Sequence, residues 1–516
     1  MMQIPWLSIV VFSPMVAAFL LLLVPRTARL ATRVIAIAST VVSLIGSLVV
    51  GRQYDLDAGG YQLRESYPLI PDIGISLSFG VDGWGVSLLL LTSIIIFAGS
   101  FATWTLQDRD KEFYILLLAL VCGVFGVFVS TDLFVFFLFY ELAVLPMYLL
   151  IGIWGSTKKV DEDGPFRFLF RMLDIGGKEY AAMKLTLMLL VGSAFILVGI
   201  LAMYFAAGQQ SFDIEVLGAT QYSETLQFWA FPALWIGFGS LAGVFPFHTW
   251  SPDGHASAPT AVSMLHAGVL MKLGAFGVMR IGMVMMPEGA IVWAPIVGIV
   301  AVINIVYGAM CALRQTDLKY IIAYSSVSHM GVVMLGAATL QLDAWNGAIY
   351  QMFAHGMMTG LFFALVGLIY EKSHNREIFE MGGFAKVAPG IAVFFTLAGL
   401  SSLGMPGFAG FVAEFLVFLG AWQGGFPWWA IAGILGAWIT AVYVLRATRA
   451  IFWGPGPSEE YADMSDAKGT EWVALVTLGA CLILFGVAPG LILDSIDVSS
   501  ADYLEVIEKA ALAVKP

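Results

Sequence analysis

The sequence has few charged residues and almost no cysteine. Asp, Glu, Lys and Arg make up 12% of its 516 residues, about half the share of a typical soluble domain. A soluble globular protein is therefore excluded. The three cysteines, Cys122, Cys311 and Cys481, lie far apart in apolar stretches. Because they form no CxxC pair, the sequence predicts no disulfide framework, iron–sulfur cluster or zinc site.

Signals for cofactors and nucleic acid are also missing. No pair of histidines has Asp, Glu or Cys neighbours at metal-ligand spacing. The glycine-rich run at 80–85 follows no predicted strand, so it does not match a phosphate-binding loop. The net charge of −11 lies mostly in loops and at the two ends, which argues against nucleic-acid binding. We expect no cofactor, no metal and no redox centre in this chain.

Long apolar runs fill most of the chain. Apolar residues make up 59% of it, and successive stretches of about 20 residues, enough to cross a hydrocarbon core as a helix, carry almost no charge. Hydropathy predicts an all-α polytopic membrane protein with about fourteen transmembrane helices. The predicted spans are 4–24, 32–51, 84–105, 113–131, 132–154, 181–206, 228–250, 255–283, 290–313, 318–338, 345–370, 388–420, 427–452 and 470–493.

The basic residues predict the orientation of the chain in the membrane. Nineteen of the 25 Lys and Arg residues fall in loops on one side of a fourteen-span chain, and the positive-inside rule makes that side cytoplasmic. The basic residues on the other side are Arg52, Arg64, Arg280, Lys509 and Lys515. Both termini are then expected on the outer side of a bacterial cytoplasmic membrane. The first span is followed, not preceded, by basic residues, so we expect a retained helix and not a cleaved signal peptide.

Two predicted spans are interrupted by small residues and proline. The interruptions are GSLAGVFP at 239–246 and GMPG at 404–407, where proline removes a backbone hydrogen bond in mid-membrane. Paired broken helices are typical of inverted-repeat transporters and their midplane ion sites. We expect an N-terminal three-helix segment at 1–112 and two inverted five-helix repeats at 113–283 and 290–452, with broken helices in spans 7 and 12. A C-terminal helix and tail at 453–516 complete the chain.

Three ionisable residues lie at membrane depth. Glu141 and Lys272 occur in otherwise apolar runs, and Glu414 follows the second interruption. A charge at the bilayer centre costs about 2.5–3.5 kcal/mol on insertion scales, so such residues persist mainly for a role. We predict a proton relay. The structural alternatives are a static buried ion pair and a lysine that reaches to the interface.

Histidines occur beside these residues. Those in or next to predicted spans are His248, His255, His266, His329 and His355. Their unperturbed pKa of about 6.5 suits proton transfer near neutral pH. Each one alone fits a hydrogen-bonded core histidine equally well, whereas the set favours a relay.

Several motifs together resemble one protein family. They are the fifth span with its Glu141, FPFHTWSPDGH at 245–255, AGVLMK at 267–272, QTDLKYIIAYSSVSHMG at 315–331 and GMPGFAGFVAE at 404–414. With the GVDG signature at 80–83, this combination resembles the antiporter-like subunit M (also called subunit 4) of NADH:quinone oxidoreductase, respiratory complex I. The resemblance covers nearly the whole chain.

The resemblance implies a fourteen-helix antiporter fold in a membrane arm, beside two related antiporter-like chains and joined to redox subunits of a peripheral arm. It implies a proton channel that contains Glu141, Lys272, His329, His355 and Glu414. One expected residue is different. The family's seventh-span lysine, five residues before Pro246, is Leu241 here, so Glu141 lacks its usual cation.

The predicted function is proton translocation within a complex I-type enzyme that passes electrons from NADH or ferredoxin to quinone. The chain acts as a subunit of that enzyme, among partner chains and lipid. Two alternatives stay open. One is a subunit of a multi-subunit sodium/proton antiporter or membrane-bound hydrogenase. The other is a structural scaffold that has lost pumping, which Leu241 supports.

His266 is the unusual titratable residue nearest in sequence to the missing lysine. It precedes Lys272 by six residues, roughly 9 Å along a helix and about 120° around it. We predict that His266 faces the broken seventh span and supplies a protonatable group there. The alternative is a hydrogen bond from His266 to a backbone carbonyl freed at the Pro246 interruption.

The segment 158–179 mixes charged and aromatic residues. This pattern predicts an amphipathic stretch at the cytoplasmic interface, or a partner-docking surface.

Overall fold

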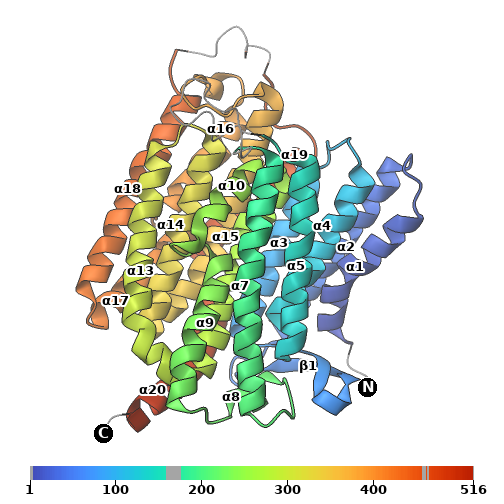
Figure 1. Ribbon diagram of the computed structural model, residues 1–516. Helices are drawn as coiled ribbons and strands as arrows, with labels where there is room; N and C mark the ends of the chain where they lie inside the picture. Colours follow the sequence, from blue (N-terminus) through green and yellow to red (C-terminus); the bar gives the residue numbers. More distant parts are fainter. Residues whose placement is uncertain (1–3, 158–175, 456–460, 462–463, 515–516) are drawn as a thin grey trace.

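The computed structural model describes residues 4–157, 176–455, 461 and 464–514. Apolar helices run side by side between two ends of the molecule (Figure 1). In the described part, twelve helices are long and apolar enough to cross a membrane, or up to thirteen spans if the bent pair Glu471–Val487 and Gly490–Leu512 counts as one. The all-α polytopic prediction is confirmed, whereas the count of fourteen and the inverted repeats stay predictions. The predicted interfacial segment at 158–179 lies largely outside the described residues.

The longer helices are α1 (Trp6–Leu23), α2 (Arg29–Gln53), α3 (Gly83–Ala102), α4 (Asp110–Val129), α5 (Leu133–Trp154), α7 (Lys178–Ala206), α9 (Glu224–Ala242), α13 (Pro287–Arg314), α14 (Leu318–Thr339), α15 (Leu342–Ser373), α18 (Pro427–Phe452), α19 (Glu471–Val487) and α20 (Gly490–Val514). Aspartates fix where three of them begin. The carboxylates of Asp82, Asp132 and Asp317 accept hydrogen bonds from the first free backbone N–H groups of α3, α5 and α14. Each cap satisfies donors that would otherwise stay unpaired in an apolar setting.

The seventh span is broken where the sequence predicted it. Helix α9 ends at Ala242, and the chain resumes through the short turn η2 (Phe247–Thr249) and α10 (Trp250–Ser257). Gly243 ends α9 at φ +71°, a left-handed conformation that glycine adopts without steric cost. The freed Phe245 N–H donates to Asn304 Oδ1 of α13 at 2.9 Å. A side chain from a neighbouring helix thus satisfies a backbone group at the break.

The predicted twelfth span is also two helices, α16 (Pro389–Ser402) and α17 (Ala409–Gln423). Gly404 and Gly407 between them have φ values of +70° and +96°, again the region that favours glycine. The second predicted interruption is therefore confirmed. The first break is buried at Gly243 and Val244, whereas Met405, Pro406 and Gly407 of the second break are exposed at the surface of the bundle.

The eighth span is irregular in a way that the sequence did not indicate. It consists of α11 (Thr260–Leu265), a π-helical turn η3 (His266–Leu270), α12 (Met271–Gly277) and a second π-helical turn η4 (Val278–Met283). Such π turns are frequent at functional sites. The whole span is buried. Glycine brings it against α9, because a Cβ at Gly274 would lie 2.4 Å from the backbone of Ala242.

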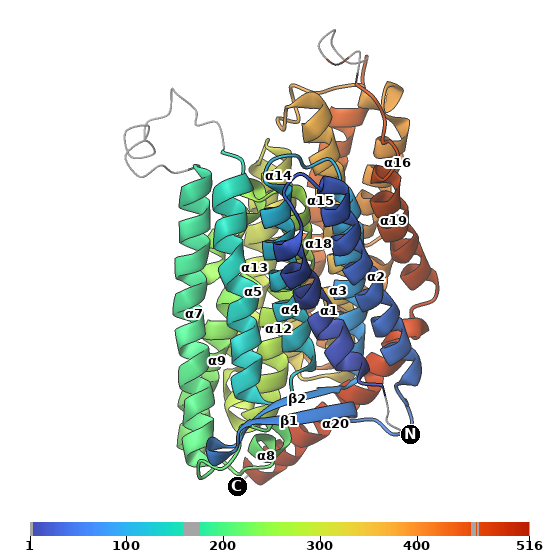
Figure 2. The same ribbon diagram turned by 90° about the vertical axis from the view of Figure 1, so that its right-hand side faces the viewer.

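One end of the bundle carries a feature that the sequence analysis treated as loop. Strands β1 (Gln62–Ile70) and β2 (Ile75–Val81) pair antiparallel through the turn η1 (Pro71–Ile73). The hairpin and α20 lie across the same end (Figure 2). A strand therefore does precede the glycine-rich run, contrary to expectation. Its amides are already used: Gly83 N–H donates to Ser499 Oγ at 2.8 Å, and Gly85 N–H donates to Asp82 at 2.7 Å.

Arg280 lies inside the protein, although the sequence placed it in an outer loop. Its side chain is 3% exposed and pairs with Asp82 at 3.1 Å. Its guanidinium also donates to the hydroxyls of Tyr61 at 2.7 Å and Tyr503 at 3.0 Å. This network joins the eighth span, the start of α3, the loop before β1 and α20. Burial raises the pKa of Tyr61 to about 12.

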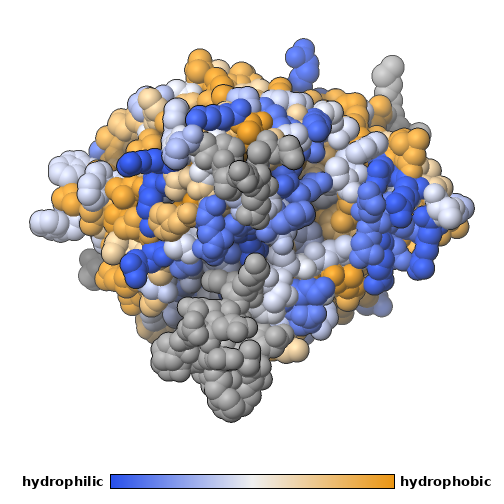
Figure 3. Space-filling model, turned by 90° about the horizontal axis from the view of Figure 1, so that it is seen from above, coloured by the Kyte–Doolittle hydropathy of each residue, from blue (hydrophilic) through white to orange (hydrophobic). Residues whose placement is uncertain are grey.

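The opposite end of the bundle is polar in its middle. Seen from above, hydrophilic residues gather toward the centre, and hydrophobic residues form much of the rim (Figure 3). The sequence prediction assigns this end to the cytoplasm.

Candidate functional site

Lys272 lies in α12 between the two π turns and is fully buried. Its Nζ donates to the backbone carbonyl of Ala267 in η3. It also lies 2.6 Å from Nδ1 of His355 on α15. Because an ammonium group is only a donor, the imidazole nitrogen accepts this hydrogen bond. The side chain is enclosed and does not reach toward either membrane surface.

The row of titratable groups continues from His355 to α17. The ring centroids of His355 and His329, on α14, lie 5.2 Å apart. His329 Nδ1 lies 3.2 Å from Glu414 Oε1, and both side chains are buried. Glu414 also lies against the second break, because a Cβ at Gly404 would be 2.8 Å from its Oε2. We call Lys272, His355, His329 and Glu414 the central row.

His329 Nδ1 lies between a hydrogen-bond donor and a carboxylate acceptor. Gln351 Nε2 lies 3.1 Å from the same Nδ1 that faces Glu414. An unprotonated Nδ1 accepts from the Gln351 amide, whereas a protonated Nδ1 donates to the Glu414 carboxylate. Both states of this nitrogen therefore have a partner, which suits a group that gains and loses a proton.

His266 lies against the broken seventh span, the position that the prediction requires, but among the described residues no polar route leads from it to Glu141; its role as a protonatable group stays a prediction. Its ring stacks on Trp250 of α10 at a centroid distance of 5.1 Å and meets the ring of His255 edge-on at 4.1 Å. The alternative of a bond to a freed carbonyl is wrong, because neither ring nitrogen has a hydrogen-bond partner. The Trp250 indole N–H binds the Ser240 carbonyl at the end of α9 instead, at 2.9 Å.

The histidine pair adjoins the central row. His255 Nε2 lies 3.1 Å from Ser251 Oγ and 3.3 Å from Sδ of Met271, the residue before Lys272. His255 is also within electrostatic range of Lys272 and His355. The eighth span thus places His266 against α10 and Lys272 against α15.

Glu141 and His248 stand apart from these groups. Glu141 is partly buried on α5 near Ser193, and its Oε1 has no partner. The His248 ring packs against Tyr307 at 5.1 Å. Within the described ranges, no hydrogen bond or ion pair joins either residue to the central row. Leu241 is fully buried in the last turn of α9. Because leucine carries no charge, that position supplies no cation for Glu141.

Sequence reasoning missed the neutral polar partners. Gln351 and Ser402 both bind His329, and Ser402 Oγ lies 3.3 Å from its Nε2. The only available signal was a polar residue in an apolar span, which is weaker than a charge. In the part of the chain that the structure describes, no three His, Cys, Asp or Glu side chains are placed to hold a metal ion.

A buried row of titratable groups that ends at a broken helix is the machinery of an ion-translocating membrane protein. The sequence model of the NADH:quinone oxidoreductase/Mrp antiporter transmembrane family matches residues 130–440. The chain belongs to this family. The predicted resemblance to the antiporter-like subunit M, or subunit 4, of complex I is confirmed by individual relatives.

These relatives match over nearly the whole length. NAD(P)H-quinone oxidoreductase chain 4 1 of Picosynechococcus sp. is 36% identical over 99% of this chain and 93% of its own. Chain 4 2 of Thermosynechococcus vestitus is 35% identical over 99% and 94%. A chain of respiratory complex I from Thermus thermophilus is similar in structure, with a TM-score of 0.85, 28% identity and coverage of 97% of this chain and 99% of that one.

A second solved structure shares the fold. One subunit of the Mrp complex from Dietzia sp. has a TM-score of 0.83 at 20% identity, and the match covers 98% of this chain and all of that one. At this identity the likeness shows the fold alone.

Proposed function

We propose that this chain translocates protons as a membrane-arm subunit of a complex I-type oxidoreductase. The observation that carries the proposal is the central row, because titratable groups on α12, α15, α14 and α17 follow one another inside the membrane bundle. Redox chemistry in partner chains, with NADH or ferredoxin as donor and quinone as acceptor, drives the transfer. The chain itself holds no redox centre.

The proposed orientation follows from the basic residues. The end shown in Figure 3 faces the cytoplasm, and the end with the hairpin and α20 faces outward, in a bacterial cytoplasmic membrane. The burial of Arg280 supports this assignment. Once it is removed from the outer loops, the basic residues favour the cytoplasmic side still more strongly.

The proposed relay passes a proton along the central row. Lys272 holds the proton between the carbonyl of Ala267 and the imidazole of His355. Lys272 gives this proton to His355, His355 passes a proton to the neighbouring ring of His329, and His329 passes one to Glu414 beside the second break. Lys272 and His355, like His329 and Glu414, already lie in contact, and the rings of His355 and His329 are neighbours. Small side-chain rotations and intervening water are therefore enough for proton transfer along the row.

The proposal is tested by proton uptake into vesicles that contain the whole complex. Redox turnover should acidify or alkalinise the vesicle lumen, depending on which way the complex is inserted, and this change should not require sodium. Vesicles prepared in sodium-free potassium buffer separate this function from the sodium/proton antiporter alternative. Transport that required sodium would favour the antiporter.

Leu241 favours the second candidate, a scaffold that no longer pumps. Replacing Glu141 by Gln keeps side-chain volume but removes a negative charge outside the central row. If the chain pumps and this charge sets the proton affinity of the next relay group, coupled proton transport should fall several-fold while assembly is kept. The measurement is the initial pumping rate in reconstituted vesicles. The control is Glu215→Gln, which removes a half-exposed carboxylate paired with Arg64. Pumping at the wild-type rate in Glu141→Gln would remove that residue from the mechanism.

His266 supplies the protonatable group beside the broken seventh span in this proposal. Because its ring contacts His255 next to Lys272, His266→Leu should reduce coupled pumping several-fold and leave assembly intact. The matched control is His374→Leu, at a loop histidine outside the bundle. Equal pumping by the two variants would show that His266 is only a packing residue.

A further inference from the structure

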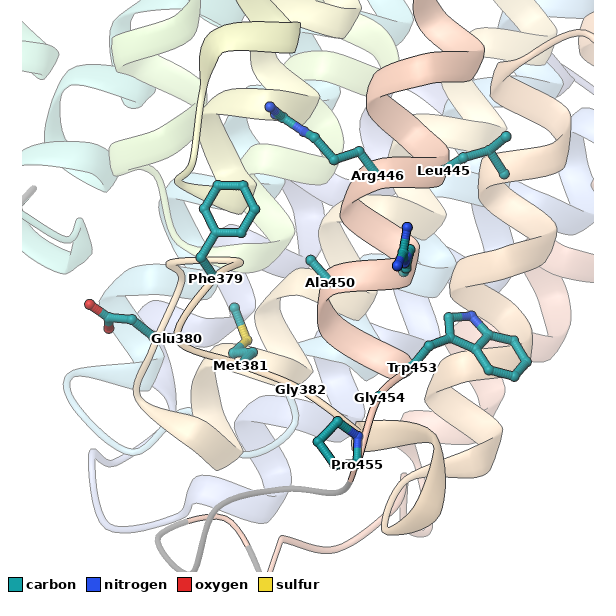
Figure 4. Close-up of a pocket in the computed structure, with 11 residues that line it drawn as sticks. Phe379, Glu380, Met381, Gly382, Leu445, Arg446, Ala450, Trp453, Gly454 and Pro455 are labelled. Atoms are coloured by element: carbon teal, nitrogen blue, oxygen red, sulfur yellow. The ribbon is translucent and has the colours of Figure 1, made fainter.

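A cavity of about 780 Å³ opens at the end of α18 that the proposed orientation places in the cytoplasm. Arg446 and Arg449 of α18 line it, together with the loop segment 379–382 and the segment 453–455. Figure 4 shows Phe379 and Arg446 on one side of this space and Trp453 on the other. None of these residues takes part in the central row.

The walls of the cavity are held in place by backbone contacts. The Gly383 N–H donates to the Trp453 carbonyl at 3.2 Å, which ties the loop to the end of α18. Lys386 Nζ donates to the Pro455 carbonyl at 2.7 Å. On the far side of the loop, the Ile378 N–H donates to the Thr316 carbonyl at 3.0 Å. The cavity is therefore a preformed feature of the fold.

The cavity is positively charged. Arg446 Nη2 donates to the Gln315 carbonyl at 2.7 Å, while its buried Nε has no partner. Arg314, at the end of α13, lies within electrostatic range of Arg446 and adds a further charge. The acidic residue in the lining, Glu380, is bound by Asn375 Nδ2 at 2.8 Å. Its carboxylate points away from α18 (Figure 4).

The length of α18 fits a position of this cavity near the level of lipid headgroups. Helix α18 has 26 residues and is about 39 Å long, longer than a hydrocarbon core of roughly 30 Å. Both arginines lie in its last two turns. Trp453 and Phe379 are 63% and 64% exposed beside them, and aromatic side chains at this level are typical of the membrane interface.

An apolar stripe leads from the cavity toward the membrane centre. Trp438, Val442 and Leu445 follow one another at helical spacing and are 66%, 41% and 54% exposed. The small residues of α18 face inward instead: a Cβ at Gly433 would lie 2.4 Å from Phe418, and one at Gly436 would lie 2.2 Å from Ile305. Close helix contacts in membranes use small residues, so this outer face of large side chains suits acyl chains better than another helix.

We propose that this cavity binds an anionic phospholipid. The phosphate contacts Arg446 and Arg449, Trp453 and Phe379 flank the headgroup, and the acyl chains lie along Trp438, Val442 and Leu445. Basic pockets on the cytoplasmic side of membrane helices have the charge that such headgroups require. The proposal does not depend on whether the chain pumps protons.

The test measures lipid retained by the whole purified complex. The complex is placed in nanodiscs of phosphatidylcholine with a minor fraction of isotope-labelled phosphatidylglycerol, extracted with detergent, washed and assayed by mass spectrometry. Each arginine should contribute roughly fivefold to retention, and the pair roughly 25-fold. The variants are Arg449→Gln alone, whose side chain is exposed and so tolerates the change without a folding defect, and Arg449→Gln with Arg446→Gln.

Matched controls decide the outcome. Arg26→Gln, an exposed arginine on the same side but beside α1, should retain as much labelled phosphatidylglycerol as the wild type. Labelled phosphatidylcholine should be retained equally by all variants. The proposal is overturned if Arg449→Gln retains phosphatidylglycerol at the wild-type level, if Arg26→Gln loses as much, or if a structure of the complex shows a neighbouring subunit filling the cavity.

Discussion

Lys272→Ala should lower coupled proton pumping by about tenfold or more, because positioned proton-transfer groups contribute roughly 10²–10⁴-fold to such steps. The side chain is fully buried and contacts His355 at 2.6 Å, so its loss interrupts the central row at its first member. If redox chemistry and transport are tightly coupled, redox turnover should fall as well. The measurements are quinone reduction and lumenal pH in the same vesicles.

Two further variants make this result specific. Lys272→Arg keeps the positive charge but cannot release its proton, so it should pump as poorly as Lys272→Ala. Lys509→Ala, which removes an exposed lysine paired with Glu505, should behave as the wild type. Full turnover and full pumping in both Lys272 variants would exclude the residue from the mechanism.

Asp82→Asn should produce the largest loss of stability. It leaves the guanidinium of Arg280, whose side chain is 3% exposed, without its anionic partner, and breaking a buried ion pair costs about 3–5 kcal/mol. The expected result is a clear fall in the thermal unfolding midpoint of the detergent-solubilised complex. The end of the bundle that carries the hairpin and α20 should unfold first.

An exposed ion pair provides the comparison. Arg64 and Glu215 are joined at 2.6 Å, but their side chains are 55% and 47% exposed, so Glu215→Gln should cost only about 0–1 kcal/mol. Adding Arg280→Met to Asp82→Asn should recover part of the lost stability, because the unpaired buried charge is then removed. Equal destabilisation by Asp82→Asn and Glu215→Gln would contradict this account of the Arg280 network.

The helices and both breaks could be predicted because each has a local signal. Long apolar runs give the spans, and Gly243 and Gly404 adopt left-handed conformations that their flanking small residues and prolines indicate. The hairpin could not be predicted in the same way. Its first strand, β1, contains a proline and two charged residues, and its stability comes from β2 and the bundle end beneath it.

The members of the candidate site could be predicted but their arrangement could not. Charged residues in mid-membrane are conspicuous, so Lys272, Glu414 and the histidines stand out in the sequence. Which of them meet depends on how α12, α14, α15 and α17 pack. The contact of His266 with His255 arises only because the chain turns back after the break at Gly243, a bend whose direction no local pattern specifies.

The two π turns on either side of α12 set the freedom of Lys272. A π turn holds one more residue than an α turn, so the span stores an extra residue at each end of the seven-residue segment that carries the lysine. Passing one residue along the helix from one turn to the other would rotate that segment by about 100°. Such a rotation changes the neighbours of Lys272 without moving Thr260 or Met283 at the two ends of the span.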